Sequence, residues 1–550
     1  TITQQADDQH VLTLTYRHRH IPLEVAVVYT VRGDTGVFTR QVTFRNQGPT
    51  DLPLEDTPTL AWLLPGSDYT LQYLHGAWGE ERQLAQETLT WGKRSFGSTI
   101  GRSSDGFSPW FCLRDEQRGV RYAAQLAYSG NWEASFFRFT EQRLVPMAEQ
   151  DLWVKLGLRH DFGGPARLKP GATLTLPWVA FTASTGDLND ITNQLHRFQR
   201  RYVIPKSTRD DPLLTQVNTF ESLGRSPVVA DLKRYTDHAV RLGIENIGPD
   251  ASWIIKTPER NTNYGHWIAD PDGFPNGMKE LADYIRAQGL TYGVWLEPET
   301  IATTAPVADE HPEWILRHNG VPMRGTRNRV FIDFRRQDVR DWNRAVVDWL
   351  VRDIGIAWLK VDYNAEVREA FDPAGAAVRS GTVLYDHLQG LDEWLDGIRR
   401  DYPDLLLEGC ASGALRFDLS MLSNTHFNWR SDVTTAKASI QLAYGATIEF
   451  APEASYHWMS GDDQHGHLDP KAPRGWWDFA FRASMNGRFG IAARMDDWTP
   501  EMWECAQSNV ALYKRIRGTI KGGDTYRLTP PPAAGQNPKG WMAIQYVSLC

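Results

Sequence analysis

Apolar and polar residues alternate along the first third of the chain. Between Val11 and Thr182 the period is two residues, and Gly, Asn and Pro separate the runs "VLTLTYRH", "LEVAVVYTV", "GVFTRQVTFRN", "RYAAQLAYSG" and "ATLTLPWVAFTA". Alternation bounded by turn residues is typical of strands with one buried face. The pattern predicts an N-terminal sandwich of antiparallel sheets over residues 1–185, which we expect to lack its beginning.

After Pro212 the pattern changes to continuous apolar runs that alternate with amphipathic helices. Residues 186–212 are helical at first, end in "VIPKSTRDDP" and form the predicted linker. Residues 213–520 contain the strand candidates "LLTQVNTFES", "ENIGPDASW", "LTYGVWLEPE", "AWLKVDYN", "LLLEGCASG", "HFNWRSD", "GATIEF" and "RFGIAAR". Helices are expected near residues 228–242, 276–288, 339–353, 383–400 and 499–516. About eight strand–helix units predict a closed (β/α)8 TIM barrel.

Two further stretches extend this plan. The apolar run "RVFIDF", residues 329–334, is one strand more than a barrel needs, so we expect it to be an extra element in the loop after the third strand. Residues 521–550 combine turn residues with short apolar pieces. They predict the start of a small C-terminal β-domain, inside which the chain stops.

Composition narrows the class of protein. A net charge of -8 and a pI near 6.0 give no attraction toward phosphate backbones or anionic lipid, so we expect no nucleic acid and no membrane partner. The four cysteines, Cys112, Cys410, Cys505 and Cys550, are too far apart for a zinc motif. Reduced thiols and a cytoplasmic location are expected. The 22 Trp supply flat apolar faces that serve either as core or as platforms for sugar rings.

Polar side chains follow the apolar runs of the predicted barrel. Active sites of such barrels lie at the carboxyl ends of the strands, so these side chains are candidates for catalysis. Strand by strand, they are Asp250 and Trp253; Glu297 and Glu299; Lys360, Asp362 and Asn364; Glu408, Cys410 and Ser412; and Trp429, Ser431 and Asp432. One alone would more often be a helix cap or a paired barrel group, but together they predict an active site.

Many carboxylates and aromatic rings, with no metal-ligand spacing and no glycine-rich phosphate loop, favour glycoside hydrolysis. Retaining hydrolysis needs two carboxyl groups roughly 5 to 5.5 Å apart, and Asp362 and Asp432 are the predicted pair. Lys360 lies on the same strand face as Asp362 and would keep it ionised as a nucleophile, unless it only forms a barrel salt bridge. Asp432, beside Trp429, would keep its proton and act as the general acid.

The segments around both carboxylates resemble glycoside hydrolase family 36, the retaining α-galactosidases. "WLKVDYN" resembles that family's nucleophile strand, Lys-Trp-Asp-x-Asn. "EGCASGALRFDLSML" and then "NWRSDVTT" resemble its Cys-Ala-Ser-Gly and Ser-Asp acid/base segments, and residues 265–299 are similar to the stretch between its second and third strands. Upstream, "LHGAWGEERQL", "GRSS" and "AYSGNWEA" resemble pieces of its N-terminal β-supersandwich. The resemblance covers nearly the whole chain.

The resemblance implies that Asp362 is the nucleophile and Asp432 the acid/base. With it, the predicted substrate-binding residues are Asp250, Trp253, Trp267, Arg327, Lys360, Asn364, Cys410, Gly413, Phe220 and Trp429. Arg327 could equally be an exposed loop cation, and Cys410 a small buried apolar residue. The chain departs from the family at Ala251, which stands where a second carboxylate holds the sugar. A lost acceptor should relax or redirect sugar specificity.

We therefore expect a retaining exo-α-glycosidase without cofactor, most simply an α-galactosidase acting on terminal α-galactosyl residues. One alternative is the same mechanism on another sugar, such as an α-N-acetylgalactosaminide or α-glucoside, or transfer to an acceptor sugar. The other is a carbohydrate-binding barrel without activity. The expected partner is an oligosaccharide or glycoside, and the resemblance also implies a homo-oligomer, either a tetramer or a dimer.

Overall fold

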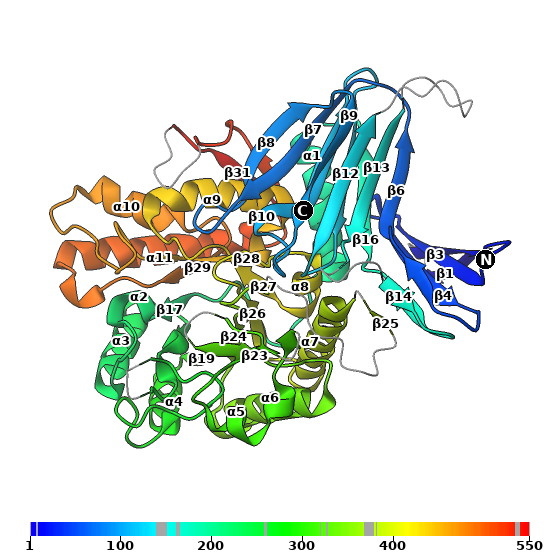
Figure 1. Cartoon of the computed structure of the whole chain (residues 1–550). Coiled ribbons are helices and arrows are strands. Elements are labelled where there is room, and N and C mark those ends of the chain that lie inside the picture. The colour runs from blue at the N-terminus through cyan, green and yellow to red at the C-terminus, as the bar shows by residue number, and fades with distance from the viewer. Residues whose placement is uncertain are drawn as a thin grey trace.

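A β-rich N-terminal part lies beside an α/β barrel in the computed structural model of the chain (Figure 1). The structure describes residues 2–6, 9–138, 151–160, 166–257, 261–318, 321–325, 328–367, 379–380, 382–533 and 540–548. The N-terminal part contains the expected antiparallel sheets, and the barrel follows it in the chain. Both predicted architectures are confirmed.

The N-terminal part is built on two main sheets. The larger one contains β1 (Ile2–Ala6), β2 (Gln9–Arg17), β3 (Leu23–Arg32), β4 (Val37–Asn46), β16 (Val179–Ser184), β11 (Val120–Leu126), β10 (Gly106–Asp115), β7 (Tyr69–Gly76) and β8 (Gln83–Thr88) in this spatial order, with β15 (Thr173–Thr175) beside β4. The smaller one has the order β6 (Pro58–Leu64), β13 (Leu152–Leu158), β12 (Trp132–Arg138) and β9 (Gly92–Ser98). Aromatic rings join the two sheets: the Phe111 ring lies 5.0 Å from that of Phe136, edge to face. The alternating pattern thus buries one face of each sheet in a shared core.

Eight parallel strands close the barrel. They are β17 (Gln216–Asn218), β18 (Asn246–Gly248), β19 (Thr291–Leu296), β24 (Trp358–Val361), β26 (Leu406–Gly409), β27 (Phe427–Trp429), β28 (Ser455–Met459) and β29 (Arg488–Ile491). The pairing of β17 with β29 completes the circle. Because all eight run in the same direction, their carboxyl ends open on one rim.

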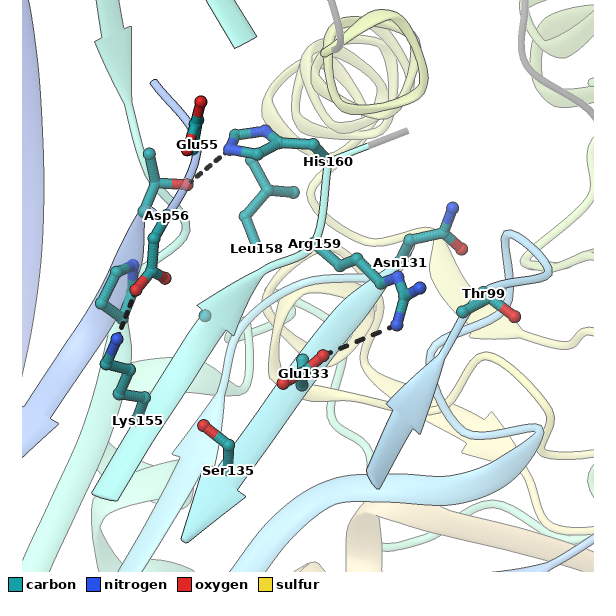
Figure 2. Close-up of a pocket in the computed structure, with 13 residues that line it drawn as sticks. Glu55, Asp56, Thr99, Asn131, Glu133, Ser135, Lys155, Leu158, Arg159 and His160 are labelled. Atoms are coloured by element: carbon teal, nitrogen blue, oxygen red, sulfur yellow. Dashed lines mark hydrogen bonds and ion pairs between the residues drawn. The ribbon is translucent and has the colours of Figure 1, made fainter. Parts of the chain in front are cut away.

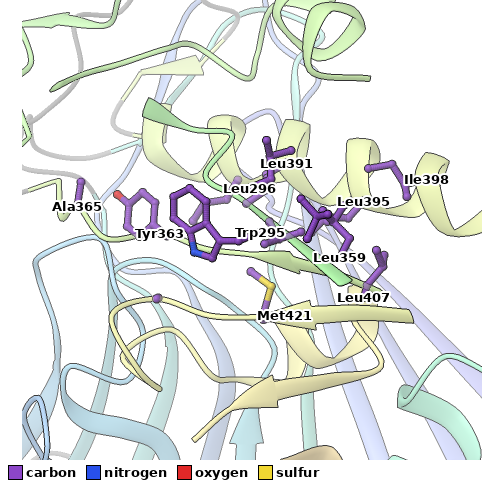
Figure 3. Packing of buried hydrophobic residues seen from close by; sticks show 14 of the residues in the cluster. Trp295, Leu296, Leu359, Tyr363, Ala365, Leu391, Leu395, Ile398, Leu407 and Met421 are labelled. Carbon is purple, nitrogen blue, oxygen red and sulfur yellow. The ribbon is translucent and has the colours of Figure 1, made fainter. Parts of the chain in front are cut away.

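The helices lie around the barrel and connect its strands. They are α2 (Phe220–Leu223), α3 (Val229–Leu242), α4 (Met278–Ala287), α5 (Pro306–Glu310), α6 (Gln337–Trp349), α7 (Val383–Asp401), α8 (Leu419–Asn424), α9 (Ala436–Glu449), α10 (Arg474–Ala483) and α11 (Pro500–Ile520). The apolar stripe of α7 packs on three strands, as Figure 3 shows. Its contact surface is formed by Leu391, Leu395 and Ile398 against Leu296, Leu359 and Leu407.

One predicted strand is wrong. "GATIEF" begins at Gly445 and lies at the end of α9. The seventh barrel strand is β28, which begins ten residues after Gly445. Nearly every side chain of α9 is buried, so the helix lacks a polar face. A short apolar run of this kind cannot be assigned to strand or helix by its period.

The remaining elements follow the expectations. The ninth run forms β23 (Arg329–Phe331), which pairs outside the barrel with β20 (Thr300–Ala302) after the third strand. The predicted linker begins with α1 (Leu188–Phe198). Near the end of the chain, β30 (Asp524–Arg527) pairs with β31 (Ile544–Val547). In the described ranges, no helix combines the length and apolar character that crossing a membrane requires. The domain boundaries themselves stay a prediction.

Candidate active site

A cavity of about 430 Å³ opens at the carboxyl ends of the barrel strands. Both predicted catalytic carboxylates, Asp362 and Asp432, line it. Of the predicted substrate-binding residues, it brings together Phe220, Asp250, Lys360, Asn364 and Trp429. The size suits a small ligand, and the polar groups converge from several barrel strands and the loops that follow them.

Three hydrogen bonds from two side chains and one backbone N–H hold the Asp362 carboxylate. The Trp295 indole donates from Nε1 to Oδ2 at 2.9 Å, and the Asn364 amide donates from Nδ2 to the same oxygen at 2.6 Å. The backbone N–H of Tyr363 donates to Oδ1 at 2.7 Å. Donors on both oxygens stabilise the ionised form of the carboxyl and fix its orientation.

Burial alone would raise the pKa of Asp362, but the nearby Lys360 ammonium and the hydrogen bonds from Trp295, Cys410 and Asn364 lower it below its ordinary value. Asp362 is therefore a buried carboxylate that keeps its charge. An ionised oxygen in a water-poor site is what a nucleophile needs, since the proton has already been removed.

Asp432 is held in a different way. Two indoles donate to it, Trp429 from Nε1 to Oδ1 and Trp78 from Nε1 to Oδ2, each at 3.0 Å. Burial raises the pKa of Asp432, the charge of Asp362 raises it further, and the two indoles and Lys360 counter only part of that rise. The two carboxyl groups share one cavity while their surroundings move their pKa values in opposite directions, which separates an acid from a nucleophile.

Lys360 acts on two carboxylates of the cavity, Asp362 and Asp250. Its ammonium donates to Asp250 Oδ2 at 3.1 Å and lies 5.1 and 4.8 Å from the ring centres of Trp429 and Trp458. Asp250 also accepts from the Asn218 amide at 3.0 Å. The next residue, Ala251, lines the cavity with a methyl group. At these two neighbouring positions the wall therefore offers the carboxylate of Asp250 and the methyl group of Ala251.

The loop between β7 and β8, residues 77–82, reaches from the N-terminal sheets into the barrel mouth. Trp78 contacts Asp432 there, and Ser431 donates from Oγ to Glu81 Oε2 at 2.8 Å. Arg82 forms a buried ion pair with Glu449 of α9 at 2.9 Å. The N-terminal part thus supplies a wall of the cavity and orients the acid/base group.

α9 has a glycine where this loop crosses it. A Cβ atom at Gly445 would lie 1.9 Å from the carbonyl oxygen of Arg82, a distance that no side chain tolerates. The Arg82 guanidinium also donates to the carbonyl oxygens of Ala414 and Phe417, at 3.3 and 2.6 Å. The loop is therefore fixed to the barrel by its backbone as well as by its charge.

Several predicted substrate-binding residues are not brought to the cavity. Trp253 is fully buried and donates from Nε1 to the Trp295 carbonyl oxygen at 2.9 Å, and Trp267 stacks 6.5 Å behind it. Both belong to the packing beneath the cavity. Cys410 is buried beside Asp362, and its thiol stabilises that carboxylate. Gly413, with φ of 86°, leaves room for Glu81. Arg327 lies outside the described residues.

The cavity also contains residues that the sequence analysis did not assign to it. They are Trp78, Glu221, Arg225, Tyr264, Trp295, Arg329, Trp458, Gln464 and His465, while Ser412 and Ala251, which the sequence analysis singled out, line the cavity as well. Glu221 is notable because burial, together with the charges of Asp250 and Asp432, raises its pKa to about 8. Its position directly after the first strand was a usable signal, since polar residues at strand ends were the criterion elsewhere. Within the described part of the chain, no cluster of His, Cys, Asp or Glu has a metal-binding arrangement, and the absence of a cofactor stays a prediction.

A carboxylate pair with separated pKa values in the mouth of a (β/α)8 barrel places the chain among the glycoside hydrolases. Comparison with known proteins agrees. The Melibiase family matches residues 173–523, and the family described as the glycosyl hydrolase family 36 N-terminal domain matches residues 1–150. The chain belongs to glycoside hydrolase family 36, as its motifs predicted.

Relatives that match over nearly the whole chain have alpha-galactosidase in their names. Alpha-galactosidase 1 of Pediococcus pentosaceus is 28% identical over 98% of this chain and 72% of its own length. Alpha-galactosidase AgaA of Geobacillus stearothermophilus is 27% identical over 99% of this chain and 73% of its own length. A crystal structure of an AgaA variant in complex with raffinose superimposes with a TM-score of 0.89 at 25% identity, covering 98% of this chain and 74% of that one.

Proposed function

We propose that the chain is a retaining exo-acting α-galactosidase that releases terminal α-galactosyl residues by double displacement. The observation that carries this proposal is the cavity shared by Asp362, which is held ionised, and Asp432, which is held protonated to higher pH. The names of its relatives and the raffinose and stachyose complexes of AgaA supply the sugar. The substrate class is a galactosyl oligosaccharide or another α-galactoside.

In the first step, an ionised oxygen of Asp362 attacks the anomeric carbon, and the bond from that carbon to the leaving oxygen breaks. Asp432 gives its proton to the leaving oxygen, so the departing alcohol is neutral. The negative charge of Asp362 becomes part of an ester bond. Lys360, paired with Asp250, remains beside it and stabilises the carboxylate before attack and after release.

In the second step, water attacks the same carbon while Asp432 accepts its proton, and Asp362 leaves as a carboxylate. The sugar is released with the configuration that it had in the substrate. Asn364 positions Asp362 throughout, because its amide also donates to Glu297 at 3.0 Å and its oxygen accepts from Ser412 at 3.0 Å. An amide held at both ends cannot turn away from the nucleophile.

The stereochemistry is tested by following the hydrolysis of an aryl α-galactoside by proton NMR. We expect α-galactose as the first product, with the β anomer appearing only by mutarotation. Initial release of β-galactose would refute the double displacement. Trapping with a 2-fluoro galactosyl fluoride should label Asp362, and a label on Glu221 would move the nucleophile to that residue.

A second candidate, the same mechanism on a different α-linked sugar, is favoured by one observation. Ala251 lines the cavity where the family has a carboxylate, so position 251 has room for a ring substituent and its side chain offers no acceptor to a hydroxyl. Comparing kcat/KM for aryl α-galactoside, α-N-acetylgalactosaminide and α-glucoside decides between the two.

Oligomerisation and a cytoplasmic location remain part of the proposal. The three described cysteines are buried and unpaired with each other, as reduced thiols would be.

A further inference from the structure

A second large cavity lies far along the N-terminal part, on the outer face of the four-stranded sheet (Figure 2). Its volume is about 610 Å³, and its lining shares no residue with the catalytic cavity. A neighbouring cavity of about 400 Å³ shares Ser135 and Lys155 with it. The two cavities therefore form one continuous groove across this face, which we call the sheet groove.

The strand register arranges the groove in rows. In the first row Trp153 of β13 pairs with Phe137 of β12, and Leu63 of β6 lies on the other side of Trp153. The second row contains Lys155 opposite Ser135. Since neighbouring strands are about 4.8 Å apart, four strands give the groove a length of roughly 14 Å.

The first row is aromatic and accessible. Trp153 is 38% exposed and Phe137 is 40% exposed, although both belong to a well-ordered sheet. The alternate residues of the same strands, such as Val154 and Phe136, are fully or almost fully buried in the sandwich core. The period of two thus directs these two large rings to the outer face of the sheet, where part of each ring remains in contact with solvent.

The other rows are polar but carry no net charge. In the third row Glu133 lies opposite Gly157 and forms ion pairs with Lys93 at 2.9 Å and with Arg159 at 3.6 Å. Lys155 is paired with Asp56. Across the two linings, three acidic residues (Glu55, Asp56, Glu133) face three basic ones (Lys93, Lys155, Arg159). His160 adds a neutral ring, because burial lowers its pKa and Thr57 lies 3.2 Å from its Nε2.

These features select one ligand chemistry. Balanced charges give no field to attract a phosphate, a nucleic acid or an acidic peptide. Many hydrogen-bond donors and acceptors beside an aromatic row suit a neutral molecule that is covered with hydroxyl groups and has one apolar ring face. We propose that the sheet groove is a second, non-catalytic carbohydrate-binding site that holds a neutral oligosaccharide or a segment of a polysaccharide.

The test uses the full chain with Asp362→Ala, so that the bound sugar is not consumed. Migration is measured in native gels that contain galactomannan, xyloglucan, mixed-linkage glucan or starch. We expect retardation by at least one of them. Trp153→Ala in the same background should weaken that binding roughly tenfold, the effect of losing about one stacking contact. Ser135→Trp, which adds a large side chain at a residue that lines both cavities, should do the same.

The matched control is Trp541→Ala, because Trp541 is 90% exposed and lies outside the sheet groove. This variant should bind as tightly as the Asp362→Ala parent. In an otherwise wild-type chain, Trp153→Ala should leave kcat/KM on an aryl α-galactoside unchanged, since the cavities share no residue. That measurement separates a failure of the groove from a failure of the catalytic proposal.

Three results would overturn the sheet groove as a sugar site. The first is the absence of retardation with every polysaccharide. The second is equal binding by Trp153→Ala, Ser135→Trp and the Trp541→Ala control. The third is a change of molar mass in light scattering when Trp153 is replaced, which would identify the face as a contact between copies of the chain. Thermal midpoints of all variants, compared with the control, show that the fold is intact.

Discussion

The indole of Trp78 should set the pH at which the enzyme loses activity on the alkaline side. Its N–H donates to Asp432 at 3.0 Å, and donation to an oxygen stabilises the charged carboxylate more than the neutral acid. Trp78→Phe removes the donor and keeps a ring. The pKa of Asp432, already raised by burial and by Asp362, should therefore rise further.

The size of the effect follows from the exposure of Trp78. A hydrogen bond to a charged group contributes about 1.5–3 kcal/mol when it is buried. Trp78 is 47% exposed, so water replaces part of the lost donor, and we take about 1 kcal/mol. This corresponds to an upward shift of roughly 0.7 pH unit in the alkaline limb of kcat/KM. Trp429→Phe removes a buried donor to the same carboxyl and should give a larger shift in the same direction.

The assay is the pH profile of kcat/KM on an aryl α-galactoside at constant ionic strength. The acid limb reports the ionisation of Asp362 and should not move, because Trp78 donates to Asp432 while Asp362 accepts from Trp295 and Asn364. Trp541→Phe is the control for replacing an exposed indole. An alkaline limb that stays in place, or that moves to lower pH, would show that Trp78 does not stabilise the charged form of Asp432.

Asp362→Ala should abolish nearly all turnover with an unchanged far-UV spectrum, and substantial residual hydrolysis would remove its role as nucleophile. Arg82→Met leaves Glu449 buried without its cation, which should lower the free energy of unfolding by about 3–5 kcal/mol and lower the thermal midpoint. The control is Arg17→Met, which breaks the exposed pair of Arg17 with Glu24 and should change the free energy of unfolding by no more than about 1 kcal/mol. Ala251→Asp adds an acceptor to the cavity wall and should raise the preference for α-galactoside over α-glucoside by roughly tenfold or more, measured as the ratio of the two kcat/KM values. An unchanged ratio would mean that residue 251 does not face the sugar.

Most barrel strands could be predicted from the sequence because a buried parallel strand leaves a simple trace: a short apolar run that ends in polar residues. β24 and β26 both fit this description. α9 fits it too, although it is a helix, because its burial on all sides removes the polar stripe that would have identified it. Gly445 of this helix is required because the carbonyl oxygen of Arg82 lies against it. Arg82 belongs to a loop more than 360 residues earlier, so no local sequence pattern could have predicted this contact.

The site could be predicted where residues that line the cavity are also close together in the sequence. Lys360 lies on β24, and Asp362 and Asn364 follow at alternate positions just beyond its end, so the period of a strand predicts that the three share one face. Trp295 could not be found in this way, since it occupies the middle of an apolar run and only the closed barrel brings its N–H to Asp362. Trp253 also stands at a strand end, but its ring is fully buried, donates to the Trp295 carbonyl oxygen and does not line the cavity.

The contact between Trp78 and Asp432 shows that the barrel alone does not form the candidate active site. The two residues are 354 positions apart, and the loop that carries Trp78 is fixed to the barrel by the buried pair of Arg82 and Glu449. Loosening that loop would first remove an N–H donor from the acid/base carboxyl, while Asp362 would keep its hydrogen bonds, which come from the barrel. The barrel therefore positions its own nucleophile, but the proton-transfer group depends on the N-terminal sheets. A partial detachment of those sheets should consequently change the alkaline limb of the pH profile before it abolishes turnover.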